Sequence, residues 1–67
     1  MAKMTMAAAR KNNNLTQQDV AEKLGVSRNT VANWETGKKE IRPAYLMAFC
    51  LITNTKEDDI LLPIKFA

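Results

Sequence analysis

Residues 16–36 constrain this chain most, because they predict two short helices joined by a sharp turn. Thr16 and Asp19 have the spacing of a capping box, in which each side chain bonds the backbone N–H of the other residue at a helix start. Gly25 stands where a helix end usually requires a positive φ. Ser27 is a good N-cap for a second helix. The apolar residues fall on one face of each helix: Val20, Ala21 and Leu24, then Val31 and Trp34.

The order and separation of these residues are those of a helix-turn-helix, with Val26 as an apolar plug in the turn. Three segments carry the likeness: Leu15-Thr16-Gln17, Gly25-Val26-Ser27 and Trp34-Glu35-Thr36-Gly37-Lys38. Over about residues 5–61, the chain resembles the Cro/cI-type (lambda-repressor-like, XRE) family of DNA-binding regulators. The resemblance implies an all-α, compact five-helix domain at residues 1–62, with its helix-turn-helix at residues 17–36.

The five expected helices are residues 3–12, 17–24, 28–35, 43–53 and 56–61, and an apolar tail follows at 63–67. The first helix has a thin inward face, with Met6 and Ala9, and three asparagines end it. The fourth helix begins at Pro43 and is apolar almost all round. It is therefore expected either to form the buried centre of the bundle or also to meet a second subunit. Thr55 and Asp58 repeat the capping-box spacing and predict the fifth helix.

Composition excludes several classes of function. There is no histidine, no paired thiol, no glycine-rich phosphate loop and no carboxylate pair in an apolar setting, so we predict no enzyme, no cofactor and no metal site. The single cysteine, Cys50, is expected to be a small core residue. No apolar run approaches the roughly 20 residues that span a bilayer. We therefore expect a soluble, cytoplasmic protein without membrane contact and without a small-molecule ligand.

The predicted recognition helix, residues 28–35, would lie in the major groove with its N-terminal residues at the base edges. Arg28 has the donors for a bidentate pair with guanine, and Asn29 or Asn33 can pair with adenine. Any solvated helix face is polar, so polarity alone does not indicate DNA binding. Here the inward residues already match the helix-turn-helix motif, which favours base reading by the exposed face. The predicted base-reading residues are Ser27, Arg28, Asn29, Thr30 and Asn33.

Ten basic residues against seven acidic ones give a mild net charge of +3, but four of the basic residues cluster in and just after the recognition helix: Arg28, Lys38, Lys39 and Arg42. Residues 38–42, which follow the recognition helix, are expected to lie along the sugar-phosphate backbone. The alternative is a solvated loop whose charges serve only solubility. By resemblance, Gln17 bonds a phosphate and braces a residue of the recognition helix, while Arg10 and Glu35 form a structural ion pair. The predicted phosphate-binding residues are Gln17, Gln18, Lys38, Lys39 and Arg42.

The resemblance implies sequence-specific binding to a double-stranded DNA operator by a regulator that represses or switches transcription, as a Cro-like phage or prophage protein does. A regulator of a restriction-modification or toxin–antitoxin operon would use the same domain. The alternative from another class is a protein-interaction module that uses the same helical face; RNA binding is weaker, because exposed aromatic residues are missing. One helix-turn-helix buries a modest interface, so we expect a homodimer on a pseudo-palindromic site. Its predicted contacts are Ile60, Leu62, Ile64 and Phe66.

Overall fold

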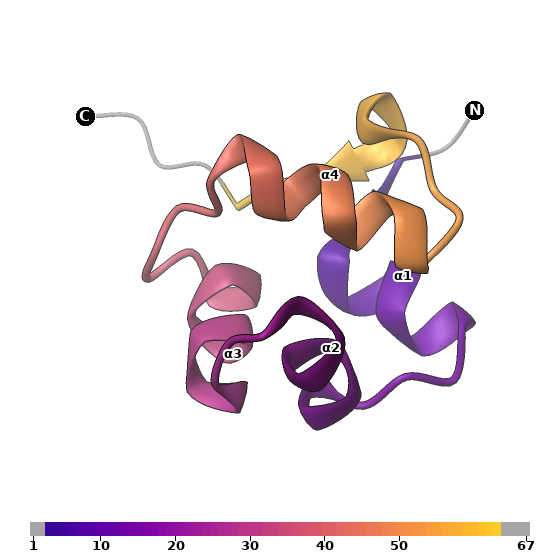
Figure 1. Ribbon diagram of the computed structural model, residues 1–67. Helices are drawn as coiled ribbons and strands as arrows, with labels where there is room; N and C mark the ends of the chain where they lie inside the picture. Colours follow the sequence, from indigo (N-terminus) through magenta and orange to yellow (C-terminus); the bar gives the residue numbers. More distant parts are fainter. Residues whose placement is uncertain (1–2, 64–67) are drawn as a thin grey trace.

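A computed structural model describes residues 3–63, and in this part of the chain four α-helices pack around one core (Figure 1). The helices are α1 (Met6–Asn12), α2 (Gln17–Leu24), α3 (Arg28–Thr36) and α4 (Pro43–Ile52). A single 3-10 turn, η1 (Glu57–Asp59), leads into a two-residue strand, β2 (Ile60–Leu61). This strand pairs in parallel with β1 (Met4–Thr5), with Met4 opposite Ile60.

The local signals at both ends of α2 are confirmed. Thr16 Oγ1 accepts a hydrogen bond from Asp19 N at 3.0 Å, and Asp19 Oδ2 accepts one from Thr16 N at 2.9 Å, which completes the capping box. Thr16 holds the pKa of the Asp19 carboxyl below its usual value, first through its backbone N–H and then through its side chain. At the other end, Gly25 takes the left-handed conformation with φ of 72°. Ser27 then caps α3 by accepting from Thr30 N.

Asparagines end α1 and α4. Asn14 and Asn54 have φ of 56° and 51°, the left-handed region that asparagine tolerates better than most residues. Between them, Asn13 Nδ2 donates to the carbonyl oxygens of Ala9, at 2.8 Å, and Thr53, at 3.1 Å. One amide therefore links the C-terminal ends of α1 and α4.

The core lies between the four helices, with Phe49 of α4 fully buried at its centre. As predicted, Met6 and Ala9 supply the inward face of α1 and Trp34 packs inside. Cys50 is also a core residue, and burial raises the pKa of its thiol. The buried apolar set is Met6, Ala9, Val20, Ala21, Val31, Trp34, Ile41, Phe49, Cys50 and Ile60.

The expectation of a helix at residues 3–12 is wrong at its start. Thr5 is the N-cap of α1, with its hydroxyl accepting from Ala8 N at 3.1 Å, so the helix begins only at Met6. The residues before it are extended because they pair with β2. An N-cap has extended dihedrals, which is also the conformation that a strand requires.

The fifth helix at residues 56–61 is likewise wrong, since the structure has η1 and β2 there. The predicted capping box does not form: the Thr55 hydroxyl donates to Thr53 O at 3.0 Å instead. Ile60 is 6% exposed, whereas its neighbour Leu61 is 53% exposed. That alternation of burial is the two-residue period of a strand, and pairing with β1 stabilises it over a short helix.

The apolar helix α4 is buried on one side only. Phe49 and Cys50 face the core, but Met47 and Leu51 are exposed, Leu51 by 81%. They are four residues apart and so lie on one face of the helix. Within residues 3–63, no helix combines the length and apolarity that crossing a bilayer requires.

Candidate nucleic-acid interface

The position of α3 is determined by its packing against α2. Helices α2 and α3 contact each other, and Val20 and Ala21 of α2 and Val31 of α3 are completely buried in the core that the two helices share. This packing turns the start of α3 outward, where Arg28 and Asn29 are exposed to solvent.

The other three predicted base-reading residues, Ser27, Thr30 and Asn33, are hydrogen-bonded to each other or partly buried. Ser27 Oγ and Thr30 Oγ1 lie 2.9 Å apart and share a hydrogen bond, and Ser27 Oγ also accepts from Thr30 N. Thr30 and Asn33 are half-buried. Arg28 and Asn29 are therefore the predicted base-reading residues that are exposed and whose side chains do not bond another predicted base-reading residue.

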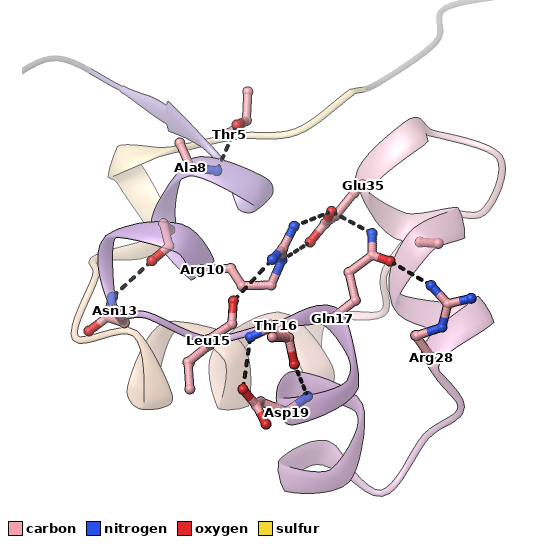
Figure 2. A network of polar contacts seen from close by, with 12 residues as sticks. Thr5, Ala8, Arg10, Asn13, Leu15, Thr16, Gln17, Asp19, Arg28 and Glu35 are labelled. Carbon is pink, nitrogen blue, oxygen red and sulfur yellow. Dashed lines mark hydrogen bonds and ion pairs between the residues drawn. The ribbon is translucent and has the colours of Figure 1, made fainter.

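A chain of polar contacts runs from the start of α3 into the interior (Figure 2). Arg28 Nη1 donates to Gln17 Oε1 at 3.3 Å, and Gln17 Nε2 donates to Glu35 Oε1 at 3.0 Å. Glu35 in turn meets Arg10, whose Nε lies 2.7 Å from Glu35 Oε2. The structure thus connects the first residue of α3 to α1 through two side chains.

Arg10 and Glu35 are buried, with side chains 10% and 7% exposed. Arg10 Nη2 donates to Glu35 Oε1 at 3.2 Å, which makes the pair bidentate, and Arg10 Nη1 donates to Leu15 O at 3.0 Å. Every nitrogen of the guanidinium therefore has a partner. Such satisfaction is what allows two charges to lie in a protein interior.

The predicted phosphate-binding residues lie in two groups. Gln17 and Gln18 open α2, where Gln18 Nε2 donates to Glu22 Oε2 at 3.1 Å. Lys38, Lys39 and Arg42 are exposed on the segment between α3 and α4, together with Glu40, whose charge opposes theirs. Lys39 N donates to Asn33 O at 3.2 Å, which anchors this segment to the end of α3.

One basic residue of this surface is missing from the sequence prediction. Lys11 of α1 borders an open hollow of about 520 Å³ between the start of α2 and the start of α3. The other residues around it are Arg10, Asn14, Leu15, Thr16, Gln17, Gln18 and Arg28. The sequence gives no reason to assign Lys11 to this surface, because the helix dipole alone explains a lysine in the last turn of a helix. Only the folded structure brings Lys11 and Arg28 to the same hollow.

The predicted dimer contacts differ in where the structure places them. Ile60 is a core residue, because it is the inward member of β2, and it is not available on the surface. Leu62 is half-buried and borders a hollow of about 250 Å³ beside Trp34 and Gly37. Ile64 and Phe66 lie outside the described residues.

Among residues 3–63, no cluster of three histidine, cysteine or carboxylate side chains has the arrangement of a metal site. The described features are instead those of a polar recognition surface. They consist of a short helix pair with a glycine turn, an exposed arginine and asparagine at the start of the second helix, and a basic segment after it. Together these features define a small helix-turn-helix domain.

Comparison with protein families agrees with this class. A family model described as Helix-turn-helix matches residues 6–60, which is most of the chain, and the protein belongs to this family, of the Cro/C1 type. Membership identifies a DNA-binding regulator of transcription. Neither the search of curated proteins nor the search of solved structures found a match.

Proposed function

We propose that this protein binds a pseudo-palindromic operator as a homodimer and represses or switches transcription, in the manner of a phage or prophage Cro protein. The observation that carries the proposal is the exposed Arg28 at the start of α3, whose guanidinium donates a hydrogen bond to Gln17 of α2. A helix N-terminus in the major groove is where such a side chain reaches base edges. The neighbouring hollow and basic segment supply groups for the phosphates on either side.

In this proposal the base-reading residues are Ser27, Arg28, Asn29, Thr30 and Asn33. Arg28 makes a bidentate pair with guanine O6 and N7. Asn29 pairs with adenine N6 and N7, while Ser27 and Thr30, which already share a hydrogen bond, add secondary contacts. The half-buried Asn33 meets the groove further along α3.

The phosphate contacts come from both sides of α3. Lys38, Lys39 and Arg42 follow it in the chain, and Gln17, Gln18 and Lys11 surround its start in space. These contacts give orientation and affinity that depend on salt but not on sequence. A mixture of cations and neutral amides is suited to phosphate oxygens, because both types supply N–H donors.

The dimer contact is proposed at the C-terminal end of the chain. The exposed Leu61 replaces the buried Ile60 in the predicted set, beside Leu62, Ile64 and Phe66. Leucine at an exposed position favours association, since burying it removes apolar surface from water. In a two-fold dimer on such an operator, the two α3 helices lie in successive major grooves.

Selection of bound sequences from a random pool of DNA duplexes at moderate salt tests the proposal. We expect an enriched inverted repeat whose half-site centres lie about 10 base pairs apart, one turn of the double helix. Enrichment of a single half-site would contradict the dimer but support base reading. A pool without enrichment would contradict operator binding, and binding without any salt dependence would favour a protein partner at this surface.

A further inference from the structure

Glu35 lies at the centre of the polar chain, although it is distant from the exposed face of α3. It is in the last turn of that helix, and its carboxylate accepts three hydrogen bonds: two from Arg10 and one from Gln17. The contact with Gln17 is to Oε1, which also accepts from Arg10 Nη2. A buried carboxylate is an acceptor only, so whatever group faces it must donate.

This requirement determines the direction of the Gln17 amide (Figure 2). With Nε2 toward Glu35, the amide oxygen points to Arg28 and accepts from its Nη1. A rotation of the amide by half a turn would place an oxygen against the carboxylate and an NH₂ against the guanidinium. Both contacts would then be between like groups. Glu35 and Arg28 therefore select the same amide orientation.

The guanidinium of Arg28 keeps enough donors for a base after this contact. It has five N–H groups, of which Gln17 uses one on Nη1, and guanine recognition needs two. An exposed arginine otherwise samples many rotamers, and fixing it on binding costs conformational entropy. A side chain already directed by Gln17 loses less of that freedom when it meets DNA.

We propose that Glu35 is a positioning residue for base reading: through the Gln17 amide it directs Arg28, so the buried Arg10–Glu35 pair contributes to sequence discrimination. The inference rests on the proposed operator binding. An ion pair that only joined α1 to α3 would have no effect on base preference. Stability alone is a weak reason for a buried pair, because apolar residues of similar volume often stabilise a core equally well.

The test compares the wild-type protein with the paired variant Arg10→Met/Glu35→Leu, which removes both charges together and leaves neither unpaired. The base pair that Arg28 reads is first identified as the one at which Arg28→Ala loses its preference. Discrimination is then the ratio of affinities for the operator and for the operator altered at that base pair. We expect the paired variant to lower this ratio by about three- to tenfold, the cost of ordering one long side chain. Any change in the phosphate contact of Gln17 affects both duplexes alike and therefore cancels in this ratio.

Two controls separate an effect on the position of Arg28 from a general loss of protein stability. Phe49→Leu disturbs the core at an apolar side chain that is not a member of the network, and it should leave the ratio unchanged, although it lowers stability. In the Arg28→Ala background, adding Arg10→Met/Glu35→Leu should have no further effect on the ratio, because the residue that is positioned is absent. All measurements are made where circular dichroism shows folded protein.

Gln17→Met provides a second route if the paired variant does not fold, because it leaves both charges of the ion pair in place. It should lower the ratio at the same base pair by a similar factor. An unchanged ratio in either folded variant would overturn the positioning role while leaving operator binding intact. A wild-type protein with no base preference would instead defeat the proposed function, and the positioning role with it.

Discussion

Arg10 and Arg28 show how one residue type performs opposite tasks in a small protein. Arg10 is buried with partners for every nitrogen, whereas Arg28 is exposed and bonds Gln17 through one nitrogen only. The difference cannot be seen in the local sequence around either arginine. It arises because Glu35, from the other end of α3, lies beside Arg10.

At the residue scale, Arg28→Ala should weaken binding to the operator by about 1–3 kcal/mol and relax preference at one base pair. Lys39→Ala is the matched comparison, since it removes a cation from the same surface but no predicted base contact. It should weaken specific and random duplexes alike and lower the slope of log affinity against log salt by about one. Fluorescence anisotropy over a salt series measures both effects. Equal losses on operator and random DNA for the two variants would contradict this division of roles.

Arg10→Ala should destabilise the fold by about 3 kcal/mol or more, because it leaves the Glu35 carboxylate buried with Gln17 as its remaining partner. Arg10→Met/Glu35→Leu should cost much less, since no charge is left without its counterpart. Urea unfolding followed by circular dichroism compares them. A paired variant as unstable as Arg10→Ala would mean that the ion pair itself stabilises the fold.

At the scale of elements, the helix ends follow from short-range chemistry. The capping box at Thr16, the Ser27 cap and the left-handed Gly25 all form as the sequence predicts, because each involves residues no more than a few positions apart. The predicted helix at 56–61 fails for the opposite reason. A strand of two residues has no stability alone, so β2 exists only because β1 lies beside it.

The capping box should make stability depend on pH. The pKa of Asp19 is lowered in the folded protein by hydrogen bonds from Thr16. The stability that the charged carboxylate contributes is therefore fully present above the ordinary aspartate pKa and is lost as pH falls through the lower folded value. The stability gap between wild type and Asp19→Asn should therefore narrow from pH 7 to pH 3. Urea unfolding at the two pH values measures it. A gap that stays constant would show that the charge on Asp19 does not contribute.

The two turn glycines should differ in their tolerance of alanine. Both have positive φ, so either substitution has a backbone cost of about 1–2 kcal/mol. A Cβ at Gly25 would meet nothing within 4 Å, but one at Gly37 would lie 2.9 Å from Pro63 O and 3.2 Å from Pro63 Cβ. Gly37→Ala should therefore lower the unfolding midpoint more than Gly25→Ala does. Equal midpoints would mean that Pro63 moves aside without cost.

At the scale of the whole molecule, the core buries one side of α4 and one side of β2. Their outer sides leave Met47, Leu51 and Leu61 exposed. The sequence shows that α4 is apolar all round but does not show which side is covered. That side is decided by the helices that pack beneath it, which bury Phe49 and Cys50.

A chain shortened to end at Leu62 tests where the dimer contact lies. If the apolar tail joins two copies, this variant should lose operator affinity and sediment as a monomer at concentrations where the full chain is dimeric. Its binding to a single half-site should remain, because α2 and α3 are intact. Unchanged sedimentation and full operator affinity would move the contact away from residues 63–67.

The sequence by itself determined the helix-turn-helix, its caps, its turn and the identity of its exposed residues, because these depend on interactions within a few positions and on the period of apolar residues. Only the tertiary structure decided the pairing of Met4 with Ile60 and the direction of the Gln17 amide between Glu35 and Arg28. Both depend on groups that are distant in the chain and meet only when the core has formed. Short-range chemistry therefore specifies the two helices of the motif, whereas packing specifies the short strand pair and the direction of the Gln17 amide.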